Sequence, residues 1–384
     1  MRILLIGEFS RLHNSLKEGL VALGHEVTII SNGDGFKNYP SDFSTKPIFC
    51  DSKLMKLPRK AIHKLTNFDF ATFEIGIRFY FHLKKLNNFD VVQLINEAPI
   101  QTIPNFERFL LKRIFKNNNK IFLLCCGVDY VVAKYLIEKK ERYSIMNPYF
   151  ENPKAKNEYQ FILDFLKPNH KKTHDLIYKN IRGVIASDID YLLPLKNNSK
   201  FLGLIPNPVN IDKIEFSNTP ISNKIIIFLG INRGTYFSKG ISFFEQALEI
   251  IKVKYSNKIE IVIAENLPYS EYFSKYNSAH IILDQVYGFD QGYNALEAMA
   301  KGKVVFSGAE KEFDDYYNLS EKVAINALPD VDNIVENLSF LIENPDEIIA
   351  ISKSARVFIE KVHNYKIIAK KYLEKFKILN CINL

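Results

Sequence analysis

At 384 residues, with 47% hydrophobic and 24% charged residues, the chain has the composition of an ordinary globular protein and is long enough for two domains. It holds no apolar run long enough to span a membrane, and its start, MRILLIGEFS, turns polar too soon for a signal peptide, so we expect a cytoplasmic protein. The net charge of +8 suits an anionic partner but does not choose among a nucleic acid, a membrane surface and a phosphorylated substrate.

The cysteines show no CxxC spacing, and two of them are adjacent inside an apolar run. Metal sites and disulfide frameworks use regularly spaced cysteines, so we expect buried, reduced thiols instead. The cysteines are Cys50, Cys125, Cys126 and Cys381.

The first residues have the pattern of a βαβ unit. Arg2–Gly7 is a near-continuous apolar run, typical of a buried parallel strand, and a helix ending at Gly24 and a strand at His25–Ser31 follow. Ligands of open α/β sheets collect where strands end, so His13 in the first loop is a candidate contact, either as a reactive group or as a structural cap. The GxGxxG fingerprint is missing, so we expect no tightly bound NAD or FAD.

A basic, aromatic helix is predicted at Phe106–Lys116. Positive charges surround its apolar face, which suits peripheral contact with the anionic inner face of the cell membrane. The alternative is a helix whose aromatic stripe packs into the core of its own domain. The apolar face comprises Phe106, Phe109, Leu110, Ile114 and Phe115, and the cations are Arg108, Lys112, Arg113 and Lys116.

Polar side chains follow two further predicted strands. Asn96 and Glu97 come after Val91–Ile95, and Asp129 comes shortly after Ile121–Cys126. The carboxyl ends of parallel strands share one edge of a sheet, so these residues are placed to meet a ligand.

A strand at Gly183–Ser187 leads into the pair Asp188 and Asp190. An Asp-x-Asp pair can hold a divalent cation against a nucleotide diphosphate. The pattern is common by chance, however, and we expect no metal site.

The segment Phe201–Asn210 contains two prolines and predicts an extended connection between domains. Beyond it the alternation of strands and helices begins again. We therefore predict an α/β fold of two Rossmann-like domains facing each other across a cleft. The second half has predicted strands at Ile225–Leu229, Ile259–Ala264 and His280–Leu283 and a helix at Phe243–Lys254.

Two stretches of the second half have features of an anion site. The loop GINRGTYFSKG places Arg233 and Lys239 after a strand, where two cations suit a pyrophosphate leaving group. Asp284–Phe306 is a glycine-containing loop, a helix and a strand, and the helix N-terminus suits a phosphate within reach of Glu297. The alternatives are solvated charges in an exposed loop and a glutamate that only complements the helix dipole.

In combination, these stretches resemble the donor domain of retaining GT-B glycosyltransferases of family four (glycosyl transferases group 1). The loop matches the family's G-x-x-R…K-G pattern, the helix matches L-E-A-M-A-x-G-x-P-V-V, and IPNPVN fits the interdomain P-N-x-V-D pattern. The resemblance covers residues 183–384, and the first half matches only in its βαβ plan. The matching residues are Gly230, Arg233, Lys239 and Gly240 in the loop and Leu296, Glu297, Ala298, Met299, Ala300, Gly302, Val304 and Val305 in the helix and strand.

The resemblance implies roles for individual residues. Arg233 and Lys239 would bind the diphosphate of a nucleotide sugar, together with the amides around Gly292, Tyr293 and Asn294. Glu297 would accept hydrogen bonds from the ribose hydroxyls.

One position departs from the family. A first glutamate, which touches the transferred sugar, usually stands eight positions before the second, and here that position is Phe289. The neighbouring Asp290 could substitute with a different geometry.

The resemblance also implies the reaction: a sugar moves from a nucleoside diphosphate to an acceptor hydroxyl with retention, in bacterial cell-surface polysaccharide or glycan assembly. The loop cations would make a metal unnecessary, and no cofactor is expected. The base would be the donor phosphate, or Asp129, Glu97 or His13. The acceptor-side domain would be residues 1–205, the donor domain 206–360, and a helix within 361–384 would cross back to the first domain.

Two other functions are compatible with the same features. A nucleotide-sugar 2-epimerase shares the architecture and a similar donor site, and a non-catalytic binding subunit would explain the missing glutamate. Nucleic-acid binding is disfavoured, because the basic residues are scattered and not interleaved with aromatic residues in one motif.

Overall fold

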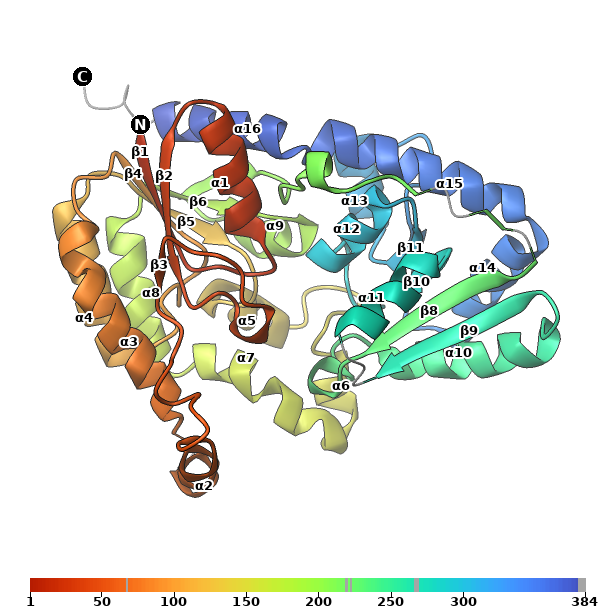
Figure 1. Ribbon diagram of the computed structural model, residues 1–384, viewed down its shortest axis with the longest axis horizontal. Coiled ribbons are helices and arrows are strands. Elements are labelled where there is room, and N and C mark those ends of the chain that lie inside the picture. Colours follow the sequence, from red (N-terminus) through yellow and green to blue (C-terminus); the bar gives the residue numbers. More distant parts are fainter. Residues whose placement is uncertain (67, 218–219, 222, 266–268, 379–384) are drawn as a thin grey trace. The chain divides into compact units, whose positions relative to one another are not determined.

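In the computed structural model, the chain divides into two compact units (Figure 1). The first unit comprises residues 1–134, 162–208 and 365–384, and the second comprises 135–161 and 209–364. The structure describes the chain except residues 67, 218–219, 222, 266–268 and 379–384. No helix in the described part is long and apolar enough to cross a membrane.

The first unit is built on a parallel sheet of seven strands in the order β3-β2-β1-β4-β5-β6-β7. The strands β4, β5 and β6 are buried along their whole length, which is why they form uninterrupted apolar runs in the sequence. The strands are β1 (Arg2–Ile6), β2 (Glu26–Ser31), β3 (Phe43–Ser44), β4 (Val91–Leu94), β5 (Ile121–Cys125), β6 (Gly183–Ala186) and β7 (Phe201–Leu204).

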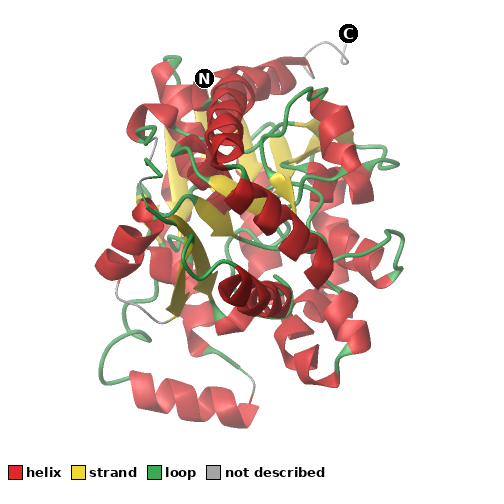
Figure 2. Cartoon of the chain, turned by 90° about the vertical axis from the view of Figure 1, so that its right-hand side faces the viewer, coloured by secondary structure: helices red, strands yellow, loops and turns green. Residues whose placement is uncertain are grey.

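Helices connect these strands and cover the sheet (Figures 1 and 2). They are α1 (Leu12–Ala22), α2 (Lys56–Thr66), α3 (Phe70–His82), α4 (Pro104–Asn117), α5 (Tyr130–Ile137), α7 (Gln160–Phe165), α8 (Pro168–Asn180), α9 (Ile189–Leu195) and α16 (Tyr365–Ile378), with α5 and α7 running across unit boundaries.

The second unit has a five-stranded parallel sheet in the order β12-β11-β10-β8-β9. Both units are thus Rossmann-like. The strands are β8 (Ile225–Ile231), β9 (Ile259–Glu265), β10 (Ile281–Leu283), β11 (Val304–Ser307) and β12 (Ile325–Asn326). The helices are α6 (Asn147–Glu151), α10 (Ile241–Lys254), α11 (Tyr269–Ser278), α12 (Tyr293–Ala300), α13 (Lys311–Tyr317), α14 (Val331–Glu343) and α15 (Pro345–Phe358).

The segment 135–161 belongs to the second unit, whereas the sequence placed it within an N-terminal domain of residues 1–205. Its side chains explain the difference. Arg142 Nη2 lies 2.7 Å from Glu310 Oε2, and the Tyr143 hydroxyl donates to the same carboxylate. Glu158 accepts hydrogen bonds from two backbone amides of the second unit. The other divisions of the chain fall at 208/209 and 364/365, near the predicted 205/206 and 360/361.

The predicted basic helix corresponds to α4, and the aliphatic residues of its apolar side face the core. Leu110 and Ile114 are buried, together with Leu111, whereas Phe109 is 40% exposed. The aliphatic residues of this helix therefore pack into the core of their own domain, as the second of the two alternatives expects.

Of the cysteines, Cys50 and Cys125 are buried free thiols and Cys126 is a half-buried one. Cys381 lies outside the described residues.

The C-terminal helix α16 packs directly on α1 in the first unit. At Gly19 the approach is so close that an added Cβ would lie 2.3 Å from the Tyr365 carbonyl oxygen and 2.9 Å from Ala369 Cβ. Phe376, near the end of α16, packs its ring 4.9 Å from that of Phe122 on β5. Because a backbone atom blocks the space at Gly19, the contact cannot relax by a change of rotamer.

We therefore predict that Gly19→Leu lowers the free energy of unfolding by about 2 kcal/mol or more, since overpacking a close contact forces the backbone apart. Urea unfolding followed by circular dichroism measures the change. Val21→Leu, at a half-exposed position of the same helix, serves as the control and should be nearly neutral. Equal stability of Gly19→Leu and the wild-type protein would contradict this packing.

Candidate functional site

The strand order of the second sheet reverses between β8 and β10. The chain runs from β8 to β9 on one side and then to β10 on the other side of β8. In open α/β sheets, ligands bind beyond the carboxyl ends of the strands at such a switch point. The two segments that leave these strands, 232–240 and 284–292, are the two stretches with anion-binding features.

Lys239 and Asp284 join these two segments. Lys239 Nζ lies 2.7 Å from Asp284 Oδ1, and the Val286 amide donates to the Lys239 carbonyl oxygen at 3.1 Å. Gly240 has φ +64°, and an added Cβ would lie 2.2 Å from Val286 Cγ2, so only glycine allows the close approach. The ion pair and the backbone contact fix the ammonium group of Lys239 at the switch point.

Arg233 lies on the other side of β8. Both of its hydrogen bonds to Glu265, the last residue of β9, measure 2.7 Å, and its guanidinium lies 4.9 Å from the centre of the Tyr236 ring. The hydrogen bond to Glu265 raises the pKa of Arg233 and lowers the pKa of Glu265. The two predicted cations are therefore both paired with carboxylates, on opposite sides of β8, and Gly230 lies within that strand.

Glu158 holds the loop that carries both cations. Its carboxylate accepts hydrogen bonds from the amides of Phe237 and Ser238, at 3.0 and 2.8 Å. The sequence did not indicate this role, because Glu158 is 79 residues away from Phe237 and has no motif around it.

The helix α12 begins at the same edge. Its N-cap is Gly292, and among the described residues no side chain caps the helix. An added Cβ on Gly292 would meet nothing within 4 Å, so there is open space beside the N-cap. The first N–H groups of a helix point along its axis, and together with the helix dipole they make such a terminus suitable for an anion.

The other residues predicted on α12 differ in exposure. Tyr293 is buried, Asn294 is exposed and Glu297 is half-buried. Burial lowers the pKa of Lys301, and the charge of Glu297, one turn earlier, opposes that shift.

Phe289, at the position of the family's first glutamate, is a core residue. It is 2% exposed, its ring centre lies 5.3 Å from that of Tyr143, and the Arg142 guanidinium lies 4.8 Å from its centre. Asp290 is also buried, and its Oδ1 accepts a hydrogen bond from the Gln291 amide at 2.7 Å.

Gln291, directly before the N-cap of α12, was not predicted as a site residue. Its side chain is buried, and Nε2 donates to the Gly308 carbonyl oxygen at 2.5 Å. Its Oε1 has no hydrogen-bond partner among the described residues. The site therefore includes a buried acceptor that suits a ligand donor.

In the first unit, the predicted residues Glu97 and Asp129 lie together at the ends of β4 and β5. Glu97 accepts from His174 Nδ1 at 2.7 Å and from the Tyr130 amide at 3.2 Å, and Asp129 accepts from the Val132 amide at 2.9 Å. Burial, and then the charge of Glu97, raise the pKa of Asp129 to about 7.

His174 on α8 completes this cluster. Its ring lies between those of Tyr130 and Tyr178, at 4.7 and 4.2 Å. Burial acts to lower the pKa of His174, but the hydrogen bond and charge of Glu97 outweigh it and raise the pKa. No motif in the sequence pointed to this residue, which is 77 positions from Glu97.

His13 lies in the first turn of α1 and not in a loop. Nδ1 donates to the Gly7 carbonyl oxygen at 2.7 Å, and Nε2 lies 3.3 Å from Gln93 Nε2, which can donate to it. Burial lowers the pKa of His13 to about 4, so the ring is neutral at pH 7. These contacts fit the structural alternative for His13.

Glu8, also unpredicted, lies beside it at the end of β1. Its carboxylate is fully buried and accepts from the amides of His13 and Asn14 and from Asn14 Nδ2, at 3.3, 2.9 and 2.6 Å. Burial raises the pKa of Glu8 to about 7, although these hydrogen bonds oppose the shift.

The described residues contain no group of three His, Cys, Asp or Glu side chains placed to hold a metal ion. Asp188 instead caps α9, accepting from the Tyr191 amide at 3.2 Å.

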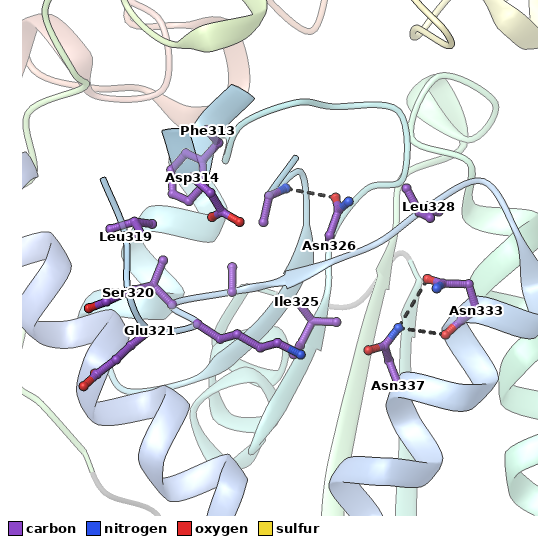
Figure 3. A pocket seen from close by; sticks show the side chains of 14 residues that line it. Phe313, Asp314, Leu319, Ser320, Glu321, Ile325, Asn326, Leu328, Asn333 and Asn337 are labelled. Carbon is purple, nitrogen blue, oxygen red and sulfur yellow. Dashed lines mark hydrogen bonds between the residues drawn. The ribbon is translucent and has the colours of Figure 1, made fainter. Parts of the chain in front are cut away.

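A pocket of about 380 Å³ lies beside β12, between α13 and α14 (Figure 3). Phe313 and Asp314 line one side of it, and Asn333 and Asn337, joined by hydrogen bonds, line another. None of the predicted donor residues lines this pocket.

Comparison with known proteins identifies the architecture. Residues 240–374 match a family model described as glycosyl transferase-like, whereas no curated protein sequence matches. Sucrose-phosphate synthase (tll1590) from Thermosynechococcus elongatus has a TM-score of 0.60 at 14% identity, covering 99% of both chains.

Two further structures share the fold. Alr3699/HepE from Anabaena, in complex with UDP and glucose, has a TM-score of 0.57 at 10% identity, covering 98% of this chain and 100% of its own. A Listeria monocytogenes structure assigned to the UDP-N-acetylglucosamine 2-epimerases has a TM-score of 0.50 at 9% identity, covering 97% and 94%.

The buried carboxyl group of Glu8 predicts a pH-dependent stability. Its raised pKa means that the folded state binds this proton more tightly than the unfolded state does, so its contribution to stability is present below pH 4.5 and is lost as the pH rises through 7. The free energy of unfolding of the wild-type protein minus that of Glu8→Gln should fall by about 3 kcal/mol between pH 4 and pH 8, in urea titrations.

The exposed Glu260→Gln variant controls for the removal of a carboxylate. If the difference in free energy of unfolding between the wild-type protein and Glu8→Gln stays constant or grows as the pH rises, the pKa of Glu8 is not raised by burial.

Proposed function

We propose that the chain transfers a sugar from a nucleoside-diphosphate sugar to an acceptor hydroxyl, because residues 240–374 match a glycosyl transferase-like family model and the chain has the GT-B fold. We propose further that the anomeric configuration is retained and that the product belongs to a bacterial cell-surface polysaccharide or glycan. The observation that carries the proposal is that the segments with Lys239 and with the N-terminus of α12 both follow strands at the switch point of the second sheet.

The diphosphate would lie before α12, where the amides of Tyr293 and Asn294 and the ammonium group of Lys239 supply positive charge. Arg233 would add a second cation. Glu265 and Asp284 hold these cations in the free protein, so the ligand would compete with two carboxylates for them. Glu297 would accept hydrogen bonds from the ribose.

In the reaction, the bond between the anomeric carbon and the diphosphate oxygen breaks, and the acceptor oxygen bonds to the same face of that carbon. The acceptor proton passes to an oxygen of the departing diphosphate. Fixed cations stabilise the charge that develops on that group, so we propose a reaction that needs no metal ion or cofactor. Asp129 and Glu97 are the alternative bases, and the pKa of Asp129, raised to about 7 by burial, suits proton transfer.

Because Phe289 is buried in the core, the donor sugar would be held by other groups than the glutamate that glycosyltransferases of family four use at this position. Asp290 is the proposed substitute, but its carboxylate already accepts from the Gln291 amide, so Gln291 Oε1 is a second candidate contact. The absence of the family's first glutamate, where this chain has Phe289, also favours a second candidate function, that of a non-catalytic binding subunit.

We predict that Arg233→Ala, Lys239→Ala and Glu297→Ala each lower the turnover of a nucleotide sugar by at least about tenfold, since each removes a group that stabilises the bound donor or its departing charge. UDP-sugars are the first donors to test, because the similar HepE structure contains UDP. Product analysis by mass spectrometry, with and without an acceptor, gives the rates.

Lys252→Ala removes an exposed cation from α10 and should leave turnover unchanged. Near-normal turnover in all three of the other variants would contradict the proposed donor site. A sugar epimer formed without acceptor would identify an epimerase, and no binding of UDP or GDP at millimolar concentration would favour the non-catalytic subunit.

A further inference from the structure

Exposed large apolar side chains are concentrated in the first unit, along residues 48–81. Its most exposed side chains are leucines on α2 and in the turn before it: Leu54 is 89%, Leu57 78% and Leu65 85% exposed. Isolated exposed apolar residues are common, but a continuous group of them marks an interaction site. We define the α2–α3 face as Ile48, Phe49, Leu54, Leu57, Leu65, Phe70, Phe73 and Phe81.

The helix α2 is oriented with its apolar side outward. Leu57, Ala61 and Leu65 recur every four residues and share one exposed side. Arg59 lies on the opposite side and makes hydrogen bonds of 2.7 and 2.6 Å to the carboxylate of Asp69. Asp69 in turn caps α3 by accepting from the Ala71 amide. The polar side of α2 is thus anchored to the protein, and the leucines are exposed on its other side. The helix α2 itself lies apart from the sheet of its unit (Figures 1 and 2).

The charges around this face are strongly positive. Residues 48–85 contain eight lysines and arginines against three acidic residues. Each of the three acidic residues, Asp51, Asp69 and Glu74, is paired with Arg59 or Arg78. Lys60 and Lys64 are exposed, and they lie beside the leucine row at helical spacing. The lysines therefore carry net positive charge to the rim of the apolar surface.

The face continues onto α4. Tyr80 of α3 stacks on Phe109 of α4 with ring centres 6.3 Å apart, and the Arg113 guanidinium lies 5.3 Å from the centre of the Phe109 ring. Lys112, Arg113 and Lys116 are exposed on that helix. The exposed part of the predicted aromatic helix thus adjoins the α2–α3 face.

From this geometry we propose that the α2–α3 face binds the surface of an anionic lipid bilayer. The leucines and phenylalanines enter the boundary between headgroups and acyl chains, and the lysines contact lipid phosphates. A second copy of the chain is a poorer partner, because a symmetric contact would place this positive surface against itself. The proposal does not depend on the proposed sugar transfer.

Flotation of the full chain with vesicles tests the proposal. The protein should bind vesicles of equal parts phosphatidylglycerol and phosphatidylcholine, and it should bind pure phosphatidylcholine vesicles at least about tenfold more weakly. Raising the salt from 50 to 500 mM should weaken binding further, because the charges are exposed. Leu57→Asp/Leu65→Asp and Lys60→Gln/Lys64→Gln should each lower the partition coefficient about tenfold or more.

Val253→Asp is the matched control, since Val253 is 84% exposed on α10 of the second unit, and it should bind like the wild-type protein. Absence of wild-type binding to the anionic vesicles would overturn the proposal, as would unchanged binding of both double variants. A dimer in light scattering that Leu57→Asp/Leu65→Asp dissociates, without vesicle binding, would assign the face to a second copy. The lipid and salt comparisons use the wild-type protein, so they decide the matter even where a variant fails to fold.

Discussion

The candidate site depends on the reversal of strand order at β8. Because the chain turns to one side of β8 for β9 and to the other side for β10, the loops after β8 and β10 emerge at one edge of the sheet. The pair of Lys239 and Asp284 then ties these loops together, and Gly240 allows their backbones to approach. An amino group, an open helix N-terminus and a buried amide acceptor are thereby brought to one place, although they lie far apart in the sequence.

The buried strands could be predicted because a parallel strand covered on both faces is an uninterrupted apolar run. Arg2–Gly7 and Ile259–Ala264 were placed within one or two residues of β1 and β9 for that reason. The two-residue strands β3 and β12 are too short to leave such a pattern. The sequence could not predict that residues 135–161 belong to the second unit. Their placement depends on contacts such as that of Arg142 with Glu310, two residues that are 168 positions apart in the sequence.

Within the site, the sequence indicated residues that belong to a local motif. Lys239, Gly292 and Glu297 lie in two short stretches, and the structure brings those stretches to one sheet edge. Glu158 and Gln291 went unnoticed because each acts through a partner that only the fold supplies. The outward leucines of α2 are a similar case, since a helical apolar pattern alone predicts burial, and only the anchoring of Arg59 at Asp69 reveals the opposite orientation.

We propose that the switch point of the second unit holds the diphosphate of a nucleotide, and a crystal structure of the chain with UDP would locate it. We expect the diphosphate before the first amides of α12, within hydrogen-bonding distance of Lys239 Nζ, and the ribose hydroxyls at Glu297. UDP bound elsewhere, for example in the pocket between α13 and α14, with the amides of Tyr293 and Asn294 left in solvent, would contradict it.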